Sequence, residues 1–437
     1  MKKSVVWFRN DLRLRDNEAL YKAAKASDIV YPVYIFDPRM FRLTELGFPK
    51  TGGHRLKFLL EAVEDLRNSL QACGSNLVIR VGLPELILPE LAARVGATAL
   101  YCSKESLSEE QKVEIALEEK LNQMKVRMDS FWQHTLYHEE DVPWPIRQVP
   151  EVFTSFRKEA EKTVQVRAEF PTITELQPFT DIDAGKIPSC NDLGIREEES
   201  DPRGVLHFRG GEKEAWQRIS YYFWEEDLLK NYKFTRNQLL GGDYSSKLSP
   251  WLSLGCISAK SVFHELKRYE QERKKNISTY WLFFELLWRD FFRFMAKKHG
   301  AKIFMINGLN EYSSEFSENH GLFEKWKNGE TGEPFIDANM KELLLTGYMS
   351  NRGRQNAASY LMHDLGIKWT WGASWFENRL IDYDASSNWL NWAYIAGVGN
   401  DPRNGRQFNI ESQTARYDPR GEYISHWLAD AAISKSL

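Results

Sequence analysis

Short apolar runs alternate with amphipathic stretches along the first part of the chain. Five of the runs have the β-branched and aromatic content of buried strands, and they lie at residues 4–8, 29–36, 77–81, 99–102 and 126–131. Four stretches between them have the spacing of amphipathic helices, and they lie at residues 17–26, 55–73, 85–95 and 108–124. Because strands that alternate with helices usually pair in parallel, the pattern predicts an α/β domain at residues 1–133.

The periodic pattern fades between residues 134 and 209, where seven prolines occur. This composition predicts a long connector on the surface, with one short helix near residues 152–164. Helical spacing resumes after this segment and strand-like runs do not recur in the sequence, which predicts an all-α domain at residues 210–437. The expected fold class is an α/β N-terminal domain with a parallel sheet, followed by an all-α C-terminal domain.

Composition narrows the class of protein without identifying an activity. With 27% charged and 42% hydrophobic residues, the chain has the balance of a soluble globular protein, and no apolar run is long enough to span a bilayer. The net charge of −3 gives no global sign of nucleic-acid binding, but it is compatible with a local basic groove. The N-terminus lacks the pattern of a signal peptide, and four scattered cysteines without a CxxC pair favour a reducing cytoplasm and no metal site.

Residues 382–394, DYDASSNWLNWAY, concentrate polar and aromatic side chains in one segment. Asp382 and Asp384 alternate, so both carboxylates point to one side if the backbone is extended. Trp389 and Trp392 are three positions apart, so they share a face if the backbone is helical. Polar groups beside aromatic rings favour a site for a flat molecule with polar edges. A capped helix with a tryptophan-rich core face explains the segment equally well.

The segment YSSKLSPWLSLGCIS at residues 244–258 predicts the start of a helix. Ser249 followed by Pro250 is typical of an N-cap and a first-turn proline. The free N–H groups of a helix start favour an anion, and Ser245, Ser246 and Lys247 add hydroxyl groups and a cation. The segment therefore predicts a phosphate cradle, and an ordinary Ser-Pro helix start is the alternative.

A helical face is predicted within YWLFFELLWRDFFRFMAKKHG at residues 280–300. Glu285, Trp288 and Arg289 lie at three- and four-residue steps on this face. A buried glutamate beside a tryptophan is costly unless it is paired or binds a ligand. The alternative to a ligand is an ion pair between Glu285 and Arg289 along the helix.

The segment MSNRGRQ at residues 349–355 places two carboxamides and two arginines together. Asn351 and Gln355 lie one turn apart if the segment is helical, with Arg352 and Arg354 alongside. Carboxamides can read base edges and arginines can hold phosphates, so the segment is compatible with nucleic-acid binding. A solvated polar helix face is the alternative.

These segments, in this order, resemble the photolyase/cryptochrome family over nearly the whole chain. VVWFRNDLRLRDNEAL resembles the family's first strand and turn, and ELLWRDFFR, MSNRGRQNAASYL and DYDASSNWLNWAYIAGVGNDPR resemble its flavin and substrate segments. NYKFTRNQLLGGDYSSKLSPWL and the GRQ after SNR are similar to the DASH cryptochromes in particular. The resemblance implies an α/β antenna domain joined by a long loop to a helical FAD domain, which agrees with the pattern above.

The resemblance also implies which residues hold FAD, the expected cofactor. Contacts to its phosphates and ribitol are expected from Tyr232, Ser245, Ser246, Lys247, Leu248 and Ser249. Arg354 and Asp382 are expected to form an ion pair beside the flavin. Asp384 is expected to hydrogen-bond the flavin, and Asn388 to face its reactive ring nitrogen, where a carboxamide can donate or accept.

In photolyases, a pyrimidine dimer flipped out of DNA docks above the flavin and is split by an electron from the photoexcited, fully reduced flavin. By resemblance, Glu285 is expected to hydrogen-bond the bases of the pyrimidine dimer, and Trp288 to stack on them. Asn351 and Arg352 are expected to line the mouth of the same site. Stacking one base on an aromatic ring contributes ~1–3 kcal/mol.

Two positions depart from conventional dimer photolyases. Gln355 stands in place of a methionine, and Tyr394 in place of a second tryptophan that grips the pyrimidine dimer. Both changes make the pocket more polar, as in DASH proteins, which act mainly on single-stranded or looped DNA. Weaker stacking is tolerable there because no duplex has to be opened, a step that costs about a few kcal/mol.

The family reduces its flavin through a chain of three tryptophans that leads to the surface. Trp392 and Trp369 match the first two members, but the third position falls at Phe316, which is hard to oxidise. The candidates for a substitute exit are Trp326, Trp371, Trp375 and Trp389. A methenyltetrahydrofolate antenna is expected at the domain interface, with Glu105 as a contact.

The sequence therefore predicts a light-driven, FAD-dependent lyase that acts on pyrimidine dimers in single-stranded DNA as a cytoplasmic monomer. A blue-light receptor that binds nucleic acid without repairing it is the main alternative. The short stretch after Trp427, in place of the long tail of many signalling cryptochromes, favours the enzyme. A redox flavoenzyme with a soluble substrate is disfavoured because WFRND, and no GxGxxG turn, follows the first strand.

Overall fold

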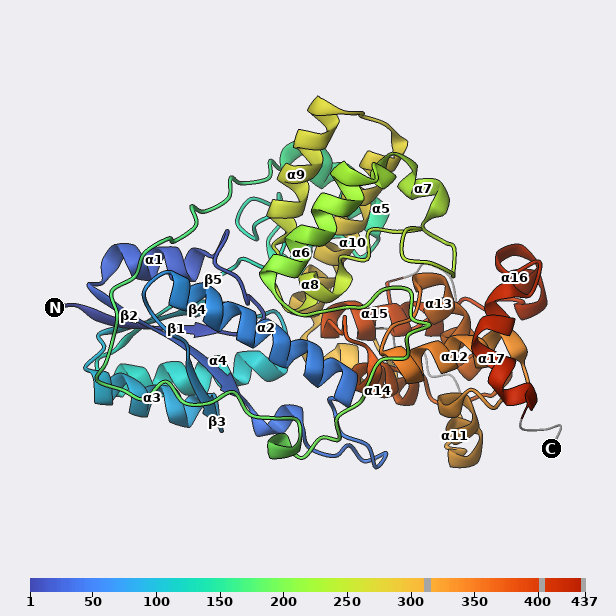
Figure 1. Cartoon of the computed structure of the whole chain (residues 1–437), viewed down its shortest axis with the longest axis horizontal. Helices are drawn as coiled ribbons and strands as arrows, with labels where there is room; N and C mark the ends of the chain where they lie inside the picture. Colours follow the sequence, from blue (N-terminus) through green and yellow to red (C-terminus); the bar gives the residue numbers. More distant parts are fainter. Residues whose placement is uncertain (310–315, 401–404, 434–437) are drawn as a thin grey trace.

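An α/β layer forms the first part of the computed structural model, which describes residues 1–309, 316–400 and 405–433 (Figure 1). The strands are β1 (Lys3–Phe8), β2 (Ile29–Phe36), β3 (Val78–Val81), β4 (Ala99–Ser103) and β5 (Arg127–Phe131). They form one sheet in the order β3-β2-β1-β4-β5, and every pairing is parallel. The five predicted strands and the parallel α/β fold class are confirmed.

Helices cover both faces of this sheet, because the side chains of a fully buried strand alternate between two cores. The covering helices are α1 (Glu18–Ala26), α2 (Gly53–Ala72), α3 (Pro84–Val95) and α4 (Ser108–Gln123). α1 and α2 pack with Val6 and Phe8 of β1, whereas α3 and α4 pack with Val5 and Trp7 of the same strand. The apolar runs in the sequence are therefore continuous because both faces of each strand are buried.

The turn after β1 lies where the strand order reverses, which is the usual ligand position in open α/β sheets. This turn also docks onto the helical part of the chain. Leu12 N–H donates to Leu254 O at 3.1 Å, and Arg13 Nη1 donates to Gly255 O at 2.9 Å. Gly255 has φ +63°, and a Cβ there would lie 1.9 Å from Asn10 O, so only glycine allows this close approach.

The connector between the two parts runs over the surface of the α/β layer (Figure 1). Its predicted helix is present as α5 (Phe153–Thr163). Further on, Ile79 N–H donates to Ala184 O at 2.7 Å, and Tyr31 Oη donates to Asp181 at 2.8 Å. The connector therefore adds hydrogen bonds along the β3 edge of the sheet. The domain boundaries at residues 133 and 209 stay a prediction.

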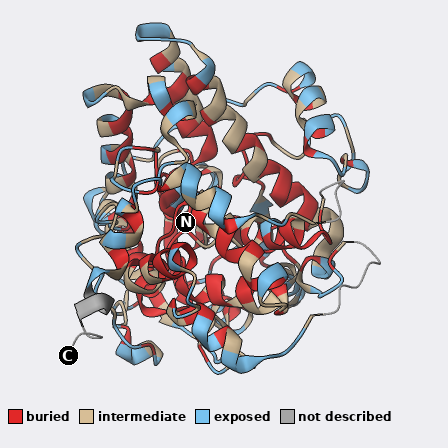
Figure 2. Cartoon of the chain, turned by 90° about the vertical axis from the view of Figure 1, so that its right-hand side faces the viewer, coloured by how far each residue is buried: buried red, intermediate tan, exposed pale blue. Residues whose placement is uncertain are grey.

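Beyond residue 211 the described residues form helices and no strand longer than a single bridge. The helices are α6 (Glu212–Ile219), α7 (Tyr232–Thr235), α8 (Ser249–Ser253), α9 (Ala259–Glu272), α10 (Ile277–His299), α11 (His320–Asn328), α12 (Pro334–Thr346), α13 (Asn351–Ser359), α14 (Trp369–Arg379), α15 (Ala385–Ala396), α16 (Ile410–Tyr417) and α17 (Glu422–Ile433). Buried residues fill the interior of this bundle, and exposed residues follow its outer turns (Figure 2). The all-α prediction is confirmed for the described residues.

Helix α10 joins the bundle to the α/β layer. Its Asp290 is fully buried and accepts hydrogen bonds from Leu136 N–H and Tyr137 N–H, both at 2.8 Å. The connector therefore begins as a fixed segment against α10. The same helix carries Glu285, Trp288, Arg289 and Arg293 toward the site described below.

Candidate active site

Three helices enclose a small cavity of about 80 Å³, called here the inner cavity. Residues of α13, α14 and α15, with the segment before α15, form its lining. The predicted site residues among them are Asn351, Arg354, Gln355, Asp382, Asp384, Asn388 and Trp392. Phe376, Leu380 and Ile395 supply apolar surface. The fold therefore brings together two sequence segments that were predicted separately.

The inner cavity contains an ion pair between a half-buried arginine and a buried carboxylate. Arg354 Nη2 lies 2.8 Å from Asp382 Oδ2, and 2% of the Asp382 side chain is exposed. Burial lowers the pKa of Arg354, but Asp382 outweighs it and the pKa is raised overall. The other carboxylate oxygen, Asp382 Oδ1, is buried and has no hydrogen-bond partner among the described residues. A bound molecule with an N–H group would satisfy this oxygen, which otherwise costs ~1–3 kcal/mol.

Asp384 closes the N-terminus of α15 and is held in its ionised form. Its Oδ1 accepts from Ser387 N–H at 2.8 Å, and Arg293 of α10 donates to Oδ2. Burial raises the pKa of Asp384, but Arg293 and Arg289 outweigh burial and the pKa is lowered overall. Asp384 is therefore a fixed hydrogen-bond acceptor at the edge of the inner cavity.

Asn388 is oriented by a backbone carbonyl of α14. Its Nδ2 donates to Ala373 O at 3.0 Å, which leaves Oδ1 as the acceptor toward the cavity. Trp392, one turn further along α15, is also part of the lining and is 2% exposed. α15 is thus a capped helix with buried tryptophans, as one interpretation of residues 382–394 expects, and its polar residues line a cavity. The binding of a flat molecule there stays a prediction.

The predicted phosphate cradle lies outside the lining of the inner cavity. α8 does begin at Ser249, with Pro250 in its first turn, but the N-cap is Leu248 and no side chain caps the helix. The prediction of Ser249 as N-cap is therefore wrong. The reason is the backbone of the preceding turn: Lys247 is left-handed (φ +54°) and Leu248 is already helical (φ −78°, ψ −8°).

Arg218 of α6 holds the backbone of the cradle. Its Nε donates to Ser246 O at 3.0 Å, and its Nη2 donates to Ser245 O at 3.0 Å. Tyr232, the other predicted phosphate contact, is buried on α7, and burial raises the pKa of its phenol. These bonds fix the cradle backbone without using the serine hydroxyl groups.

Lys247 links the cradle to the inner cavity. Its Nζ is buried and has no hydrogen-bond partner among the described residues, and burial lowers its pKa well below the usual value. Nζ lies 3.2 Å from the ring centre of Tyr244 and 5.2 Å from that of Tyr348. The Tyr348 ring is in turn 5.6 Å from Arg354 Cζ. One aromatic ring therefore separates the cradle from the ion pair.

The predicted face of α10 uses a different arginine from the expected one. Arg236 Nη1 lies 2.5 Å from Glu285 Oε1. Arg289 instead donates to the carbonyls of His134 and Leu252, the latter at 3.0 Å. The alternative of a Glu285–Arg289 ion pair is therefore wrong, because the connector and α8 occupy Arg289. Burial raises the pKa of Glu285, and Arg236 offsets only part of this effect.

Trp288 and Tyr394, two predicted substrate residues, lie side by side. Their ring centres are 6.1 Å apart at an interplanar angle of 82°. Trp288 also stacks on Phe153 of α5, with ring centres 3.7 Å apart and planes at 13°. The hydroxyl of Tyr394 accepts from Arg406. α5, α10 and α15 thus build an aromatic surface one helical turn from Glu285.

Three arginines from separate elements are near enough for their charges to interact, with Arg236 also paired to Glu285, and are called here the arginine rim. Arg236 follows α7, Arg352 belongs to α13, and Arg416 belongs to α16. Burial lowers the pKa of Arg352, Tyr417 raises it, and the charges of Arg236 and Arg416 lower it further. Arg352 Cζ and Arg416 Cζ lie 4.8 Å and 5.4 Å from the Tyr417 ring centre. Sequence reasoning identified Arg352 alone, because no local pattern connects the three.

A series of aromatic rings leads away from the inner cavity. The Trp392 ring centre is 6.2 Å from that of Trp326, which is 5.9 Å from that of Phe323. Phe323 is 5.3 Å from Trp371, which lines the larger cavity described below. Trp326 and Trp371 are therefore one pair of candidates for an electron exit.

Trp369, the second predicted member of the electron chain, contacts a different tryptophan. Its ring centre is 5.9 Å from that of Trp389, which also lines the larger cavity. Phe316 is only partly buried. Trp375 instead contacts Phe48 of the α/β layer, with ring centres 5.0 Å apart. Among the described residues, Trp371 and Trp389 are thus the better-connected exit candidates.

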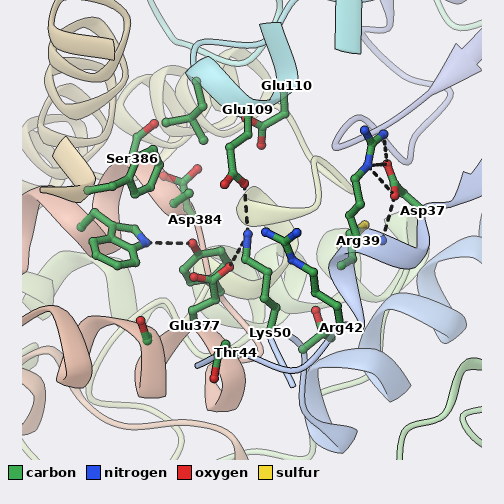
Figure 3. Close-up of a pocket in the computed structure, with 18 of the residues that line it drawn as sticks. Asp37, Arg39, Arg42, Thr44, Lys50, Glu109, Glu110, Glu377, Asp384 and Ser386 are labelled. Atoms are coloured by element: carbon green, nitrogen blue, oxygen red, sulfur yellow. Dashed lines mark hydrogen bonds and ion pairs between the residues drawn. The ribbon is translucent and has the colours of Figure 1, made fainter. Parts of the chain in front are cut away.

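A cavity of about 1360 Å³, called here the interdomain cavity, lies between the α/β layer and the helical bundle (Figure 3). Its lining includes the turns after β1, β2 and β4, at the position where open α/β sheets bind ligands. Lys50 Nζ lies 3.0 Å from Glu109 and 3.9 Å from Glu377 in this cavity. Tyr383 and Asp384 line both cavities, which therefore share a wall.

Two carboxylates on the β4–α4 side of the interdomain cavity differ in charge. Glu105 accepts from Asn10 Nδ2 at 3.1 Å and lies 3.2 Å from His134. Burial raises the pKa of Glu105, but His134 and Arg9 outweigh it and the pKa is strongly lowered. For Glu110, burial and the charge of Glu105 raise the pKa to about 7. Glu110 Oε2 has no partner among the described residues, and sequence reasoning missed it.

Membrane-spanning helices and metal clusters are both absent from the described ranges of the chain. No helix there is long and apolar enough to cross a membrane, and no three metal-ligating side chains gather. Cys73, Cys102, Cys190 and Cys256 are free thiols.

Comparison with known proteins gives consistent matches along the chain. Residues 4–176 match the family model for DNA photolyase, and residues 281–435 match that for the FAD binding domain of DNA photolyase. The Cryptochrome DASH of Gloeobacter violaceus is 49% identical over 428 residues, which cover 98% of this chain and 86% of the relative. The crystal structure of a Synechocystis cryptochrome superimposes with a TM-score of 0.95 at 48% identity, covering 98% of this chain and 89% of that chain. An archaeal photolyase from Sulfolobus tokodaii, described as holding two FAD molecules, gives a TM-score of 0.79 at 28% identity, covering 97% and 90%.

Proposed function

The chain belongs to the photolyase/cryptochrome family, among its DASH-type cryptochromes, and from that premise we propose that it splits cyclobutane pyrimidine dimers using FAD and blue light. Single-stranded or looped DNA is the proposed main substrate, and a cytoplasmic monomer is the proposed form. The observation that carries the proposal is the inner cavity, where the Arg354–Asp382 ion pair and Asn388 meet.

The residues of the inner cavity and the cradle fit FAD. Asp382 Oδ1 and Lys247 Nζ are buried polar atoms without partners among the described residues, and they suit the N–H groups of a flavin ring and a diphosphate. Asn388 Oδ1 is an acceptor for a ring N–H, and the Arg354 cation favours negative charge on the flavin. When bound in its fully reduced form, FAD supplies the photoexcited electron that opens the cyclobutane ring.

We assign the binding of the pyrimidine dimer to the α10 face. Glu285 has a raised pKa, which suits a carboxyl group that shares hydrogen bonds with base edges, and Arg236 fixes its position. Trp288 provides an aromatic surface for the bases, worth ~1–3 kcal/mol per stacked base. Gln355 and Tyr394 add polarity where stacking would otherwise be stronger, which favours substrates that need no duplex opening.

We propose that the interdomain cavity holds a light-harvesting antenna, methenyltetrahydrofolate. Its volume of about 1360 Å³ suits a large ligand, and its shared wall with the inner cavity keeps two chromophores close. Lys50 and Arg42 offer cations for a carboxylate tail, while Glu105 and Glu110 offer acceptors for a pterin. A second FAD, as in the archaeal photolyase, is the alternative, and absorption spectra of the extracted chromophores distinguish the two.

Light-driven splitting of a single-stranded oligonucleotide that carries one thymine dimer tests the proposal. We expect the reduced protein to split it under blue light, and Glu285→Ala to reduce splitting strongly because the bases lose their hydrogen-bond partner. Glu119→Ala, on the exposed face of α4, is the matched control and should act like the wild type. Dark binding without any splitting would instead favour the photoreceptor.

A further inference from the structure

Phe234 is a large apolar side chain that projects into solvent from α7. It is 72% exposed, and no other phenylalanine in the described residues is exposed to that extent. Single exposed apolar residues are common and need no special explanation. The surroundings of Phe234 therefore decide whether it has a role.

The turn that carries Phe234 is fixed to α10. Lys233 N–H donates to Ser278 Oγ at 3.2 Å, close to the start of that helix. Two residues beyond Phe234, Arg236 pairs with Glu285 at 2.5 Å. A backbone hydrogen bond on one side of Phe234 and a side-chain ion pair on the other thus hold the turn beside the face assigned to the pyrimidine dimer. A ring presented from a fixed turn loses little conformational freedom when a ligand binds it.

The arginine rim supplies positive charge next to this turn, because Arg236 lies two residues beyond Phe234 and its charge acts on Arg352. Glu285 pairs with Arg236, whereas the guanidinium of Arg352 faces the ring of Tyr417. Arg352 Nε is buried and has no hydrogen-bond partner among the described residues. Arg352 as a whole is only half-buried, and the positive charge of an arginine suits the phosphates of a nucleic-acid strand. The Tyr417 ring, covered by the guanidinium groups, is a poorer stacking surface than Phe234.

We propose that Phe234 is a stacking platform for an unpaired base that flanks the bound pyrimidine dimer, while the arginine rim holds the phosphates of the same strand. The inference rests on the proposed function, because it takes DNA as the ligand. Exposed aromatic rings beside cationic grooves are how proteins bind single strands without reading sequence. Phe234 would thus contact the substrate outside the α10 face that binds the pyrimidine dimer itself.

Phe234 also accounts for a preference for single strands. A flanking base in a duplex is already stacked and paired, so reaching Phe234 would require breaking those contacts. A base in a single strand can stack on Phe234 without that cost. The contact therefore strengthens binding of single strands and contributes little to binding of duplexes.

Binding in the dark tests this assignment on the full-length, FAD-loaded protein. Fluorescence anisotropy with an oligonucleotide that carries a central thymine dimer gives the affinity for single-stranded and duplex forms. Phe234→Ala should weaken single-strand binding by about 5- to 100-fold and leave duplex binding unchanged. Phe234→Trp should keep the wild-type affinity. Ile115→Ala, which truncates another exposed apolar side chain (58% exposed), should change neither affinity.

An abasic site placed next to the thymine dimer, first on one side and then on the other, locates the base. On one side of the thymine dimer, the abasic site should weaken binding to the wild type by the same factor as Phe234→Ala does. In the Phe234→Ala variant, the abasic site at that position should cause no further loss of affinity. Phe234→Ala should leave the salt dependence unchanged, whereas Arg352→Gln should lower the slope by about 0.7. Unchanged single-strand binding, or equal loss on both DNA forms, would overturn the assignment.

Two further results distinguish base stacking on Phe234 from self-association and from the repair function. If the wild type self-associates and Phe234→Ala abolishes the association, the side chain is a contact between copies of the chain and the assignment is overturned. If Phe234→Ala weakens single-strand binding as expected but the wild type splits no pyrimidine dimer in light, the stacking contact stands and the proposed repair function fails.

Discussion

The inner cavity and the interdomain cavity share a wall but differ in size and in how uniformly their ionisable side chains are held in the charged form. The inner cavity measures about 80 Å³ and the interdomain cavity about 1360 Å³. In the inner cavity, ion pairs shift the pKa values of Arg354 and Asp384 further toward their charged forms. In the interdomain cavity the carboxylates are less uniform: the pKa of Glu105 is strongly lowered, that of Glu110 is raised to about 7, and Lys50 pairs with carboxylates that include the exposed Glu109.

The difference indicates what each cavity can hold. Buried pairs with fixed charge suit one resident molecule, because every group is set before that molecule binds. A carboxyl group with a pKa near neutrality, such as that of Glu110, together with a partly exposed ion pair suits a molecule that binds more weakly and exchanges. Four substitutions test this contrast, and the one with the largest expected effect comes first.

Asp382→Asn should be the most damaging change, because it leaves the half-buried Arg354 guanidinium without the buried carboxylate that pairs with it. We expect most of the bound FAD to be lost and the free energy of unfolding to fall by about 1–3 kcal/mol. Flavin absorbance per protein and urea unfolding measure the two effects. Asp201→Asn is the matched control, since Asp201 pairs with Arg203 at the same 2.8 Å but with more exposed side chains. Full flavin content in Asp382→Asn would contradict the assignment of the inner cavity.

Trp392→Phe should nearly abolish light-driven reduction of FAD by an external thiol while FAD stays bound, because Trp392 lines the inner cavity. Trp326→Phe should slow the reduction more than Trp369→Phe, since the Trp326 ring contacts Trp392 at 6.2 Å. Trp375→Phe, whose ring contacts the α/β layer, is the control. Absorbance changes during illumination measure the rate, and a normal rate in Trp392→Phe would rule out the route.

Glu110→Gln should change how stability depends on pH. The pKa of Glu110 is about 7 in the folded protein and ~4.3 in an unfolded chain, so folding binds a proton between these values. The free energy of unfolding of the wild type therefore falls as pH rises through this interval. Glu110→Gln lacks the titrating group, so above the folded-state pKa it should lose roughly 1–3 kcal/mol less than the wild type does. Urea unfolding across this range measures it, with the exposed Glu119→Gln on α4 as the control. If the free energy of unfolding changed with pH in the same way for the wild type and Glu110→Gln, the raised pKa of Glu110 would be refuted.

Lys50→Ala should have the smallest effect on stability. It removes contacts of 3.0 Å and 3.9 Å to Glu109 and Glu377, and 62% of the Glu109 side chain is exposed. Such pairs contribute about 0–1 kcal/mol, and salt screens them. Urea unfolding at low and high salt should show a difference that shrinks with salt. A loss as large as that in Asp382→Asn would remove the contrast between the two cavities.

Much of the fold could be predicted because burial leaves a direct trace in the order of apolar residues. β1 and β2 lie between two helical layers, so residues 4–8 and 29–36 are continuous apolar runs. The helix start at Ser249 was predicted correctly, but its N-cap was predicted wrongly. Capping depends on backbone angles at Lys247 and Leu248, which tertiary contacts set and a Ser-Pro pattern does not specify.

The candidate site was less predictable from local patterns. Residues 349–355 and 382–394 were each predicted as a candidate site from their own composition. Only the family resemblance predicted that the two segments contribute to one site. Arg236 and Glu285 are 49 positions apart, so their pairing follows from the packing of α7 on α10. Glu110 was not predicted, because the sequence of an amphipathic helix does not distinguish a glutamate that packs into a cavity from one that faces solvent.

The ratio of light-driven splitting on single-stranded and duplex oligonucleotides tests the central claim most directly. Each form carries one thymine dimer in the same sequence, and the reduced wild-type protein is illuminated with blue light. Opening the duplex costs about a few kcal/mol, so splitting under limiting protein should favour the single strand by about one to two orders of magnitude. Gln355→Met with Tyr394→Trp should narrow the ratio by strengthening duplex binding. Equal splitting of the two forms by the wild type would contradict the substrate preference, and no splitting of either would contradict the repair function.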